Sequence, residues 1–251
     1  MQFEILGPLR VTDAGPVKVS GQRRRILLVA LLTHANSAVS NEELLDWLWP
    51  RCPPRSAQAT LHVYISTLRR ALEPYREPWQ PAERLLTHPT GYLIKVADGE
   101  LDVLRFERLL AAATPALDEG DAQRAYELAS EALAWWRGPA LADAAAVDAA
   151  RGEITRLEEL RLSAETVRVK ALLALGRHRD VVPELTRLVA HYPLHEPFYV
   201  LLMIALSQCG RRADALAVFR RARTVLAREV QVAPGRDLRR TEAAILAGEL
   251  D

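Results

Sequence analysis

The spacing of hydrophobic and polar positions changes along the chain. Val17-Lys18-Val19, near the start, alternates with the two-residue period of a strand. From Gln22 to Leu72 the hydrophobic positions recur with the period of helices. A second pair of strands is predicted over 84–96, and from Leu101 the helical period continues almost to the end. The pattern therefore predicts a mainly α chain with a small β component.

The first twenty residues predict a small antiparallel sheet. Phe3-Glu4-Ile5-Leu6-Gly7 is typical of a strand, which Pro8 interrupts and Leu9-Arg10-Val11 resumes. The segment 17–19 is predicted as a further strand. A helix is then predicted from about Gln22 to His34. Three arginines crowd its first turn, where cations oppose the helix dipole, so we expect them to contact a phosphate or a protein group: Arg23, Arg24 and Arg25. Three solvated arginines remain the alternative.

The stretch from Ser40 to Leu72 predicts two helices joined by a turn. Ser40 with Glu43 has the spacing of a capping box, and Pro50 ends the first helix. The second helix is predicted to start near Arg55 or Ser56. Its apolar positions, spaced by four, three and four residues, form one stripe: Leu61, Ile65, Leu68 and Leu72.

The opposite face of that second helix carries only small, polar and cationic residues, and the sequence has no carboxylate between Asp46 and Glu73. A solvated helix face usually mixes both signs, so this face favours a polyanion, and the layout is that of a helix-turn-helix. An ordinary helical hairpin is the alternative. The face consists of Arg55, Ser56, Ala59, Thr60, Val63, Ser66, Thr67 and Arg70, flanked by His62 and Arg69.

A Pro-rich connection over 74–81 leads to a predicted hairpin. Strands are expected over 84–87 and 92–96, with the turn His88-Pro89-Thr90-Gly91 between them. A hairpin directly after a reading helix is the wing of a winged helix. Four of its residues are expected at the tip or edge, where they would touch a phosphate backbone or an adjacent minor groove: Thr87, His88, Thr90 and Tyr92.

Helices fill the rest of the chain, and their sequence repeats. They are predicted at about 102–115, 121–136, 147–175, 178–190, 195–209, 211–228 and 235–247. Leu172, Gly176, Asp180 and Leu185 are matched 34 residues later by Leu206, Gly210, Asp214 and Phe219. This is the tetratricopeptide period, in which helical hairpins stack into an array that generally serves as a binding surface.

The length allows one large or two ordinary globular domains, and the composition is that of a globular protein. Of 251 residues, 49% are hydrophobic and 26% charged, and the net charge is +1. Residues 1–97 hold 12 Lys and Arg against 8 Asp and Glu, whereas residues 98–251 hold 21 against 24. The sequence shows no membrane-spanning run and no signal-peptide pattern, and Cys52 and Cys209 lie far apart, so we expect a cytoplasmic protein.

In its motifs and their order the chain resembles the Streptomyces antibiotic regulatory protein family. The front half carries the family's motifs in order: Phe3-Glu4-Ile5-Leu6-Gly7-Pro8-Leu9, Arg25-Ile26-Leu27-Leu28, Glu43-Leu44-Leu45, Leu48-Trp49-Pro50, the run from Thr60 to Leu72, and Gly91-Tyr92-Leu93. The second half resembles the bacterial transcriptional activator domain, with Trp136-Arg137-Gly138-Pro139-Ala140-Leu141-Ala142-Asp143, Leu175-Gly176-Arg177-His178 and Ala213-Asp214-Ala215-Leu216.

This resemblance implies an OmpR-type winged helix over 1–97 and an all-α, tetratricopeptide-like activator domain over 98–251. It also implies a transcription activator that binds direct repeats of double-stranded DNA near promoters of antibiotic or other secondary-metabolite genes. The implied partners are a second protomer on DNA and the RNA polymerase holoenzyme with its sigma factor. Larger relatives carry further domains, before which this chain is expected to end. Gln231-Val232-Ala233-Pro234-Gly235-Arg236 departs from the family's usual Gly and Asp before Pro-Gly.

Other classes of protein receive less support from the sequence. It contains no phosphate-binding loop, nucleophile elbow or His-Glu-x-x-His motif, so we expect no enzyme, catalytic residue or cofactor. The best metal candidate is His178 with His191 and His195, but Pro193 prevents a continuous helix, so no metal site is predicted. A scaffold or effector-binding regulator, whose helical domain binds a protein or small ligand, is the alternative function. Trp135 and Trp136 are predicted to pack in the protein, because helix neighbours point about 100° apart.

Overall fold

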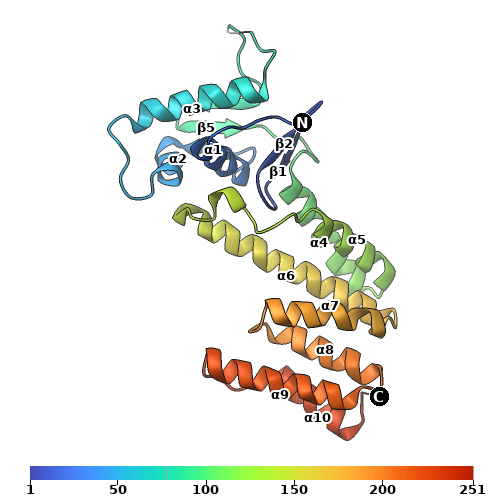
Figure 1. Ribbon diagram of the computed structural model, residues 1–251. Helices are drawn as coiled ribbons and strands as arrows, with labels where there is room; N and C mark the ends of the chain where they lie inside the picture. Colours follow the sequence, from blue (N-terminus) through green and yellow to red (C-terminus); the bar gives the residue numbers. More distant parts are fainter. Residues whose placement is uncertain (78, 251) are drawn as a thin grey trace. The chain divides into compact units, whose positions relative to one another are not determined.

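The computed structural model describes residues 1–77 and 79–250, and helices dominate it (Figure 1). The chain forms two compact units. The first holds Met1–Arg108 and Glu131–Arg161, and the second holds Leu109–Ser130 and the chain from Leu162 onward. The expected domain boundary at residue 97 stays a prediction. Pro78, in the Pro-rich connection, and the last residue of the predicted second domain lie outside the described residues.

The first unit begins with a two-stranded antiparallel sheet. β1 (Gln2–Glu4) pairs with β2 (Arg10–Thr12), and Phe3 lies opposite Val11. The prediction of a further strand over 17–19 is wrong. This segment contributes a bond from the Val17 amide to the Val11 carbonyl at 2.9 Å, and Pro16 before it has no N–H to donate to a ladder.

Three helices follow: α1 (Gln22–Thr33), α2 (Asn41–Leu48) and α3 (Ala57–Leu72). Ser40 caps α2 as predicted, since its hydroxyl accepts from the Glu43 amide at 3.1 Å. Glu43 does not complete the capping box in the predicted way, because its carboxylate lies 3.4 Å from Nε2 of His34. α2 ends before Pro50, which cannot continue a helix.

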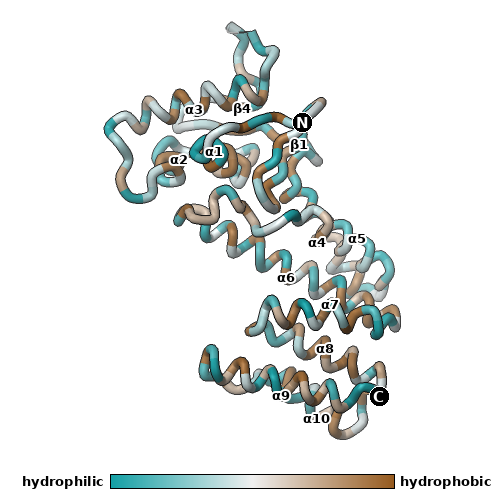
Figure 2. Tube along the Cα trace, viewed as in Figure 1, coloured by the Kyte–Doolittle hydropathy of each residue, from teal (hydrophilic) through white to brown (hydrophobic). Residues whose placement is uncertain are grey.

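The stripe predicted on the second of the paired helices forms the inner face of α3. Its four leucine and isoleucine residues are all buried, and hydrophobic and hydrophilic positions alternate along α3 in Figure 2. Burying an aliphatic side chain contributes about 1.5–3 kcal/mol, so this stripe fixes which face of the helix remains open.

The predicted hairpin is present and belongs to a three-stranded sheet. β5 (Gly91–Ile94) lies between β3 (Val39–Ser40) and β4 (Leu85–His88), and Thr87 pairs with Tyr92. At Gly91 an added Cβ would lie 2.0 Å from the carbonyl oxygen of Val39. Glycine is therefore required where the hairpin meets the strand that precedes α2.

The first unit also contains the loop after α5, which bonds to the N-terminal segment Ile5–Leu9. The amide of Arg137 donates to the Leu6 carbonyl at 2.8 Å, and the amide of Leu141 donates to Ile5 at 3.0 Å. The Asp102 carboxylate accepts from the amides of Ile5 and Leu6, and burial raises the pKa of Asp102 to about 6. The elements that follow the winged helix along the chain are α4 (Asp102–Asp118), α5 (Ala122–Ala134), the short 3-10 turns η1 (Ala142–Ala144) and η2 (Asp148–Ala150), and α6 (Arg151–Ala174), and the two units divide within the three helices.

The two tryptophans at the end of α5 pack in the first unit. Trp136 meets the ring of Phe106 edge-on at 5.4 Å, and the Arg161 guanidinium lies 4.7 Å from the Trp136 ring. Trp135 lies under Arg105 instead, at 4.8 Å. Both rings are half-buried, so they pack against neighbouring side chains of the first unit without lying in its core.

In the second unit the predicted repeat is visible as two equal turns. Gly176 and Gly210 both have φ 73°, in the left-handed region that favours glycine. After each glycine an arginine amide donates back to the helix, from Arg177 to Leu172 at 3.0 Å and from Arg211 to Leu206 at 2.9 Å. The helices around these turns are α6, α7 (His178–His191), α8 (Glu196–Gln208), α9 (Arg212–Glu229) and α10 (Arg236–Ala247).

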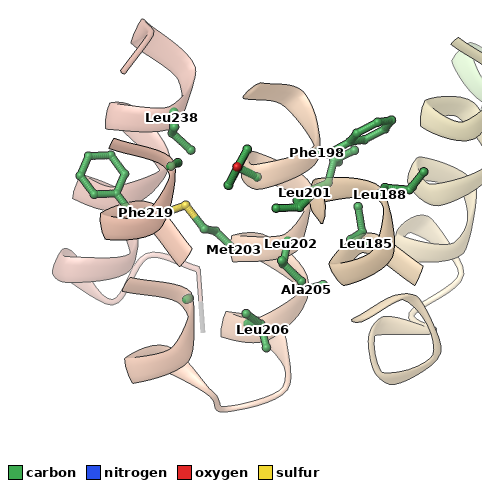
Figure 3. Close-up of a cluster of buried hydrophobic side chains, with 14 of the residues drawn as sticks. Leu185, Leu188, Phe198, Leu201, Leu202, Met203, Ala205, Leu206, Phe219 and Leu238 are labelled. Atoms are coloured by element: carbon green, nitrogen blue, oxygen red, sulfur yellow. The ribbon is translucent and has the colours of Figure 1, made fainter. Parts of the chain in front are cut away.

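One hydrophobic core holds the second unit together. In Figure 3 side chains from α7, α8, α9 and α10 converge on it, with Phe198, Met203 and Phe219 among them. α8 is buried on most of its surface, because neighbouring helices cover it on several sides. Stacked hairpins of this kind bury their apolar faces only against one another.

Candidate nucleic-acid interface

The outward face of α3 has the residues that the sequence predicted for it. Val63 is 60% exposed and leaves a methyl-bearing surface among polar groups. Two threonines are half-buried and bond to their own helix backbone. The Thr60 hydroxyl donates to the Ser56 carbonyl at 2.9 Å, and the Thr67 hydroxyl donates to the Val63 carbonyl at 2.8 Å. The exposed members of the face are Arg55, Ser56, Ala59, His62, Val63, Ser66 and Arg70.

Arg69 lies at the edge of this face and contacts the wing. Its Nε donates to the Leu85 carbonyl at 2.8 Å, and its Nη2 donates to the Thr87 hydroxyl at 2.8 Å. Its guanidinium also lies 5.9 Å from the ring centre of Tyr92. Burial lowers the pKa of Arg69 from its usual value, and the bonds to the wing stabilise the charged guanidinium. These bonds join the end of α3 to the wing, and the predicted contact of Arg69 with DNA stays a prediction.

The wing residues differ in exposure. Thr87, His88 and Thr90 are exposed, and His88 Nδ1 lies 2.9 Å from the Thr90 hydroxyl at the tip. Tyr92 is only 7% exposed, and His62 meets its ring at 6.5 Å. Burial raises the pKa of Tyr92, partly offset by Arg69. Tyr92 therefore supports the wing from inside and is not placed at its tip.

The three arginines at the start of α1 have different surroundings. Arg23 is exposed, with its guanidinium 5.1 Å from the ring of Trp49. Arg24 is half-buried. Arg25 forms an ion pair with Asp143 and donates to the Leu9 carbonyl at 2.8 Å. Of the two contacts expected here, phosphate or protein, Arg25 has the protein one, so it is not part of the open surface.

Two further residues extend the cationic and polar surface. Gln58 is exposed on α3, with its side-chain amide 3.4 Å from His62 Nε2, and Arg51 is exposed in the turn between α2 and α3. Both lie within the acid-free segment 47–72, so the absence of acids could have identified them. Helical spacing alone did not predict them, because Gln58 lies in register with the apolar stripe and Arg51 lies in the Pro-rich turn.

Within the described residues, no cluster of three or more His, Cys, Asp or Glu side chains could hold a metal ion. None of the helices over those residues has the length and apolar character to cross a membrane. α7 ends at His191 and α8 begins at Glu196, so the two nearby histidines of the metal candidate do not share a helix.

Comparison with known families finds two matches, one along each half of the chain. Residues 16–94 match the family described as transcriptional regulatory protein, C terminal, and residues 101–246 match the bacterial transcriptional activator domain.

Several regulators are similar along almost the whole chain. The regulatory protein DnrI of Streptomyces peucetius is 36% identical over 99% of this chain and 93% of its own length. The regulatory protein AfsR of Streptomyces griseus is also 36% identical, but this chain spans only 25% of it. A solved structure of Mycobacterium tuberculosis EmbR in complex with a low affinity phosphopeptide superposes with a TM-score of 0.93 at 33% identity, over 98% of this chain and 65% of that one.

Proposed function

Because this chain belongs to the Streptomyces antibiotic regulatory protein family of DNA-binding transcriptional regulators, we propose that it is a sequence-specific activator of a secondary-metabolite gene cluster. In this proposal α3 enters the major groove of double-stranded DNA, and the wing tip lies against the neighbouring backbone. The RNA polymerase holoenzyme, with its sigma factor, is recruited through the helical part of the chain.

The observation that carries the proposal is the open face of α3. An arginine lies near each end, Arg55 before the helix and Arg70 in its last turn, and the exposed residues between them bear no carboxylate. Short polar side chains allow the helix backbone to approach base edges, and the exposed Val63 suits the methyl group of thymine. A face built for solvent would carry both signs of charge.

The two arginines are assigned different tasks, which makes the proposal testable. Arg55, with Ser56, Thr60 and Val63, lies toward the start of α3 and is assigned to base edges. Arg70 is assigned to a phosphate. Arg70→Ala should weaken binding to all sequences alike and reduce the salt slope by about one, whereas Arg55→Ala should cost about 1–3 kcal/mol on the preferred sequence only.

The measurement is a mobility-shift titration on the operator and on a scrambled duplex, at several salt concentrations. Arg108→Ala is the control, since Arg108 is an exposed arginine outside the winged helix and pairs with the exposed Asp98. Equal loss of sequence preference in both test variants would contradict the assignment. Unaltered binding in both would remove α3 as the reading helix.

Two copies are proposed to bind direct repeats head to tail. One winged helix covers too few base pairs for specificity in a genome, so a second protomer is required. Head-to-tail contacts are heterologous and would be weak without DNA. The repeats should be spaced by about 10–11 base pairs or a multiple, so that both helices enter the same face of the duplex. Inserting half a turn should abolish cooperativity but keep single-site binding, and a free dimer that prefers inverted repeats would contradict this arrangement.

A further inference from the structure

The last helical hairpin of the second unit has a charge unlike the rest of that half of the chain. Residues 211–240 contain nine arginines and three carboxylates, whereas residues 98–251 together carry more acids than bases. The nine arginines are all exposed. They are Arg211, Arg212, Arg220, Arg221, Arg223, Arg228, Arg236, Arg239 and Arg240.

Three of these arginines have partners in the hairpin itself. Arg211 pairs with Asp214 at 2.7 Å, Arg228 pairs with Glu229, and Arg212 donates to the Leu246 carbonyl. The other six form no ion pair with any described residue, and we call them the arginine surface. They are Arg220, Arg221, Arg223, Arg236, Arg239 and Arg240.

Part of the arginine surface lies at one level of an antiparallel hairpin. The bond from Arg212 to Leu246 joins the start of α9 to the end of α10, and the loop 230–235 joins the other ends. Arg220 and Arg223, in the middle of α9, therefore lie level with Arg240 in the first half of α10. Cations gathered on one hairpin repel one another in the free protein, and an anionic partner would relieve the repulsion.

Apolar groups beside these charges distinguish a protein partner from DNA. Val230 and Val232, in the loop between α9 and α10, are 44% and 48% exposed. Gln231 between them has φ 57°, a left-handed conformation that is costly for a residue with a side chain. The short loop therefore has a fixed turn between the two valines. Arginine together with exposed aliphatic groups is typical of protein interfaces, whereas a phosphate backbone offers nothing to the valines.

An ordinary polar cap is the simpler explanation, because repeat arrays need a polar end for solubility. A cap requires only polarity, however, and mixed charges would supply it without repulsion. The positive sign shared by the exposed unpaired side chains of both helices favours a partner. We infer that the α9–α10 hairpin is a docking surface for an acidic protein surface of the transcription machinery, with the valines contacting apolar groups on it. This inference rests on the proposed function.

The test uses the full-length triple variant Arg220→Glu, Arg223→Glu and Arg240→Glu. These residues are exposed and unpaired, so the fold should be kept, which thermal unfolding would verify. In transcription reconstituted with the RNA polymerase holoenzyme, activation should fall at least about tenfold, because three attractive pairs become repulsive. Operator binding in a mobility shift should not change.

The matched control makes the same change of charge elsewhere in the second unit, through Arg124→Glu, Lys170→Glu and Arg179→Glu. These residues are also exposed and without ion pairs to the described chain, and the control should activate like the unaltered protein. An active triple variant, or equal losses in both variants, would overturn the inference. So would a loss of operator binding in the triple variant, which would assign the surface to DNA. Failure of the unaltered protein to bind its operator or activate would instead refute the proposed function.

Discussion

The ion pair between Asp143 and Arg25 gives the sharpest test of how the first unit is held together. The side chain of Asp143 is 10% exposed and that of Arg25 is 27% exposed. The carboxylate accepts from Arg25 Nη2 at 3.0 Å, from Arg25 Nε and from the amide of Leu9. Asp143→Asn removes the charge with little change of shape, and it leaves the guanidinium facing an amide group.

The expected loss lies between two limits. Breaking a fully buried pair costs about 3–5 kcal/mol, and breaking an exposed one costs about 0–1 kcal/mol. Because both side chains are mostly covered but Arg25 retains some access to water, we expect a loss of about 2 kcal/mol. For a chain of this size each kcal/mol shifts Tm by about 2–4 °C, so Tm should fall by about 4–8 °C.

The comparison is made by thermal unfolding followed by circular dichroism. Asp98→Asn serves as the control, because Asp98 pairs with Arg108 in the same unit but the two side chains are 87% and 62% exposed. That variant should lose less than about 0.5 kcal/mol. In a double-mutant cycle with Arg25→Gln, the two changes at the buried pair should not add. Equal, small shifts for Asp143→Asn and Asp98→Asn would refute the reasoning.

The dependence on pH follows from the same contacts. Burial raises the pKa of Asp143, but the bonds from Arg25 and Leu9 outweigh burial and set the pKa below its ordinary value. A depressed carboxyl pKa contributes stability above the unfolded value of about 3.9, and that stability is lost as the pH falls through the folded pKa. The difference between Asp143→Asn and the unaltered protein should therefore vanish in acid and be constant near neutrality.

Three further changes test other contacts. Bonds from Arg84 outweigh burial and lower the pKa of Glu100 to about 2. In chemical unfolding Glu100→Gln should therefore be less stable than the unaltered protein at pH 7, and this difference should vanish as the pH falls from about 4.3 toward 2. Gln231→Gly should raise stability by about 0.5–1 kcal/mol in urea titrations, because glycine adopts φ 57° without strain, and a loss would contradict this. Arg69→Lys should keep the preference of α3 for its bases but shorten the footprint on the wing side, since lysine cannot bond Leu85 and Thr87 together; a full footprint would exclude the wing-positioning role.

Local spacing was sufficient to predict α3, the Ser40 cap of α2 and the repeat. The stripe that begins at Leu61 fixes the buried face of α3, and its complement is the open face. Gly176 and Gly210 mark equal turns, because a helix that ends in the left-handed conformation favours glycine there. Each of these features depends on residues within a few positions of one another, which a sequence displays directly.

Contacts between distant residues could not be predicted in this way. Arg25 and Asp143 are 118 positions apart, and nothing in either local pattern pairs them. Helical spacing placed Arg69 beside the cationic face but could not show its bond to Leu85 of the wing. Tyr92 was expected at the tip or edge of the hairpin, but how deeply it is buried depends on residues distant in the sequence. Val17–Val19 alternates like a strand, but Pro16 prevents regular pairing. The assignment of individual side chains to DNA remains a prediction.

The bonds of the segment Ile5–Leu9 constrain how such regulators can be recombined. A hybrid joined near residue 97 would take Asp102, Arg137 and Asp143 from a foreign chain, and the amides of Ile5 and Leu6 would keep their acceptor only if that chain carried matching residues. A junction within α6, after residue 161, transfers both sides of every one of these contacts. The unit to transfer in such a hybrid is then the winged helix together with the loop after α5, because the bonded residues of both segments must match.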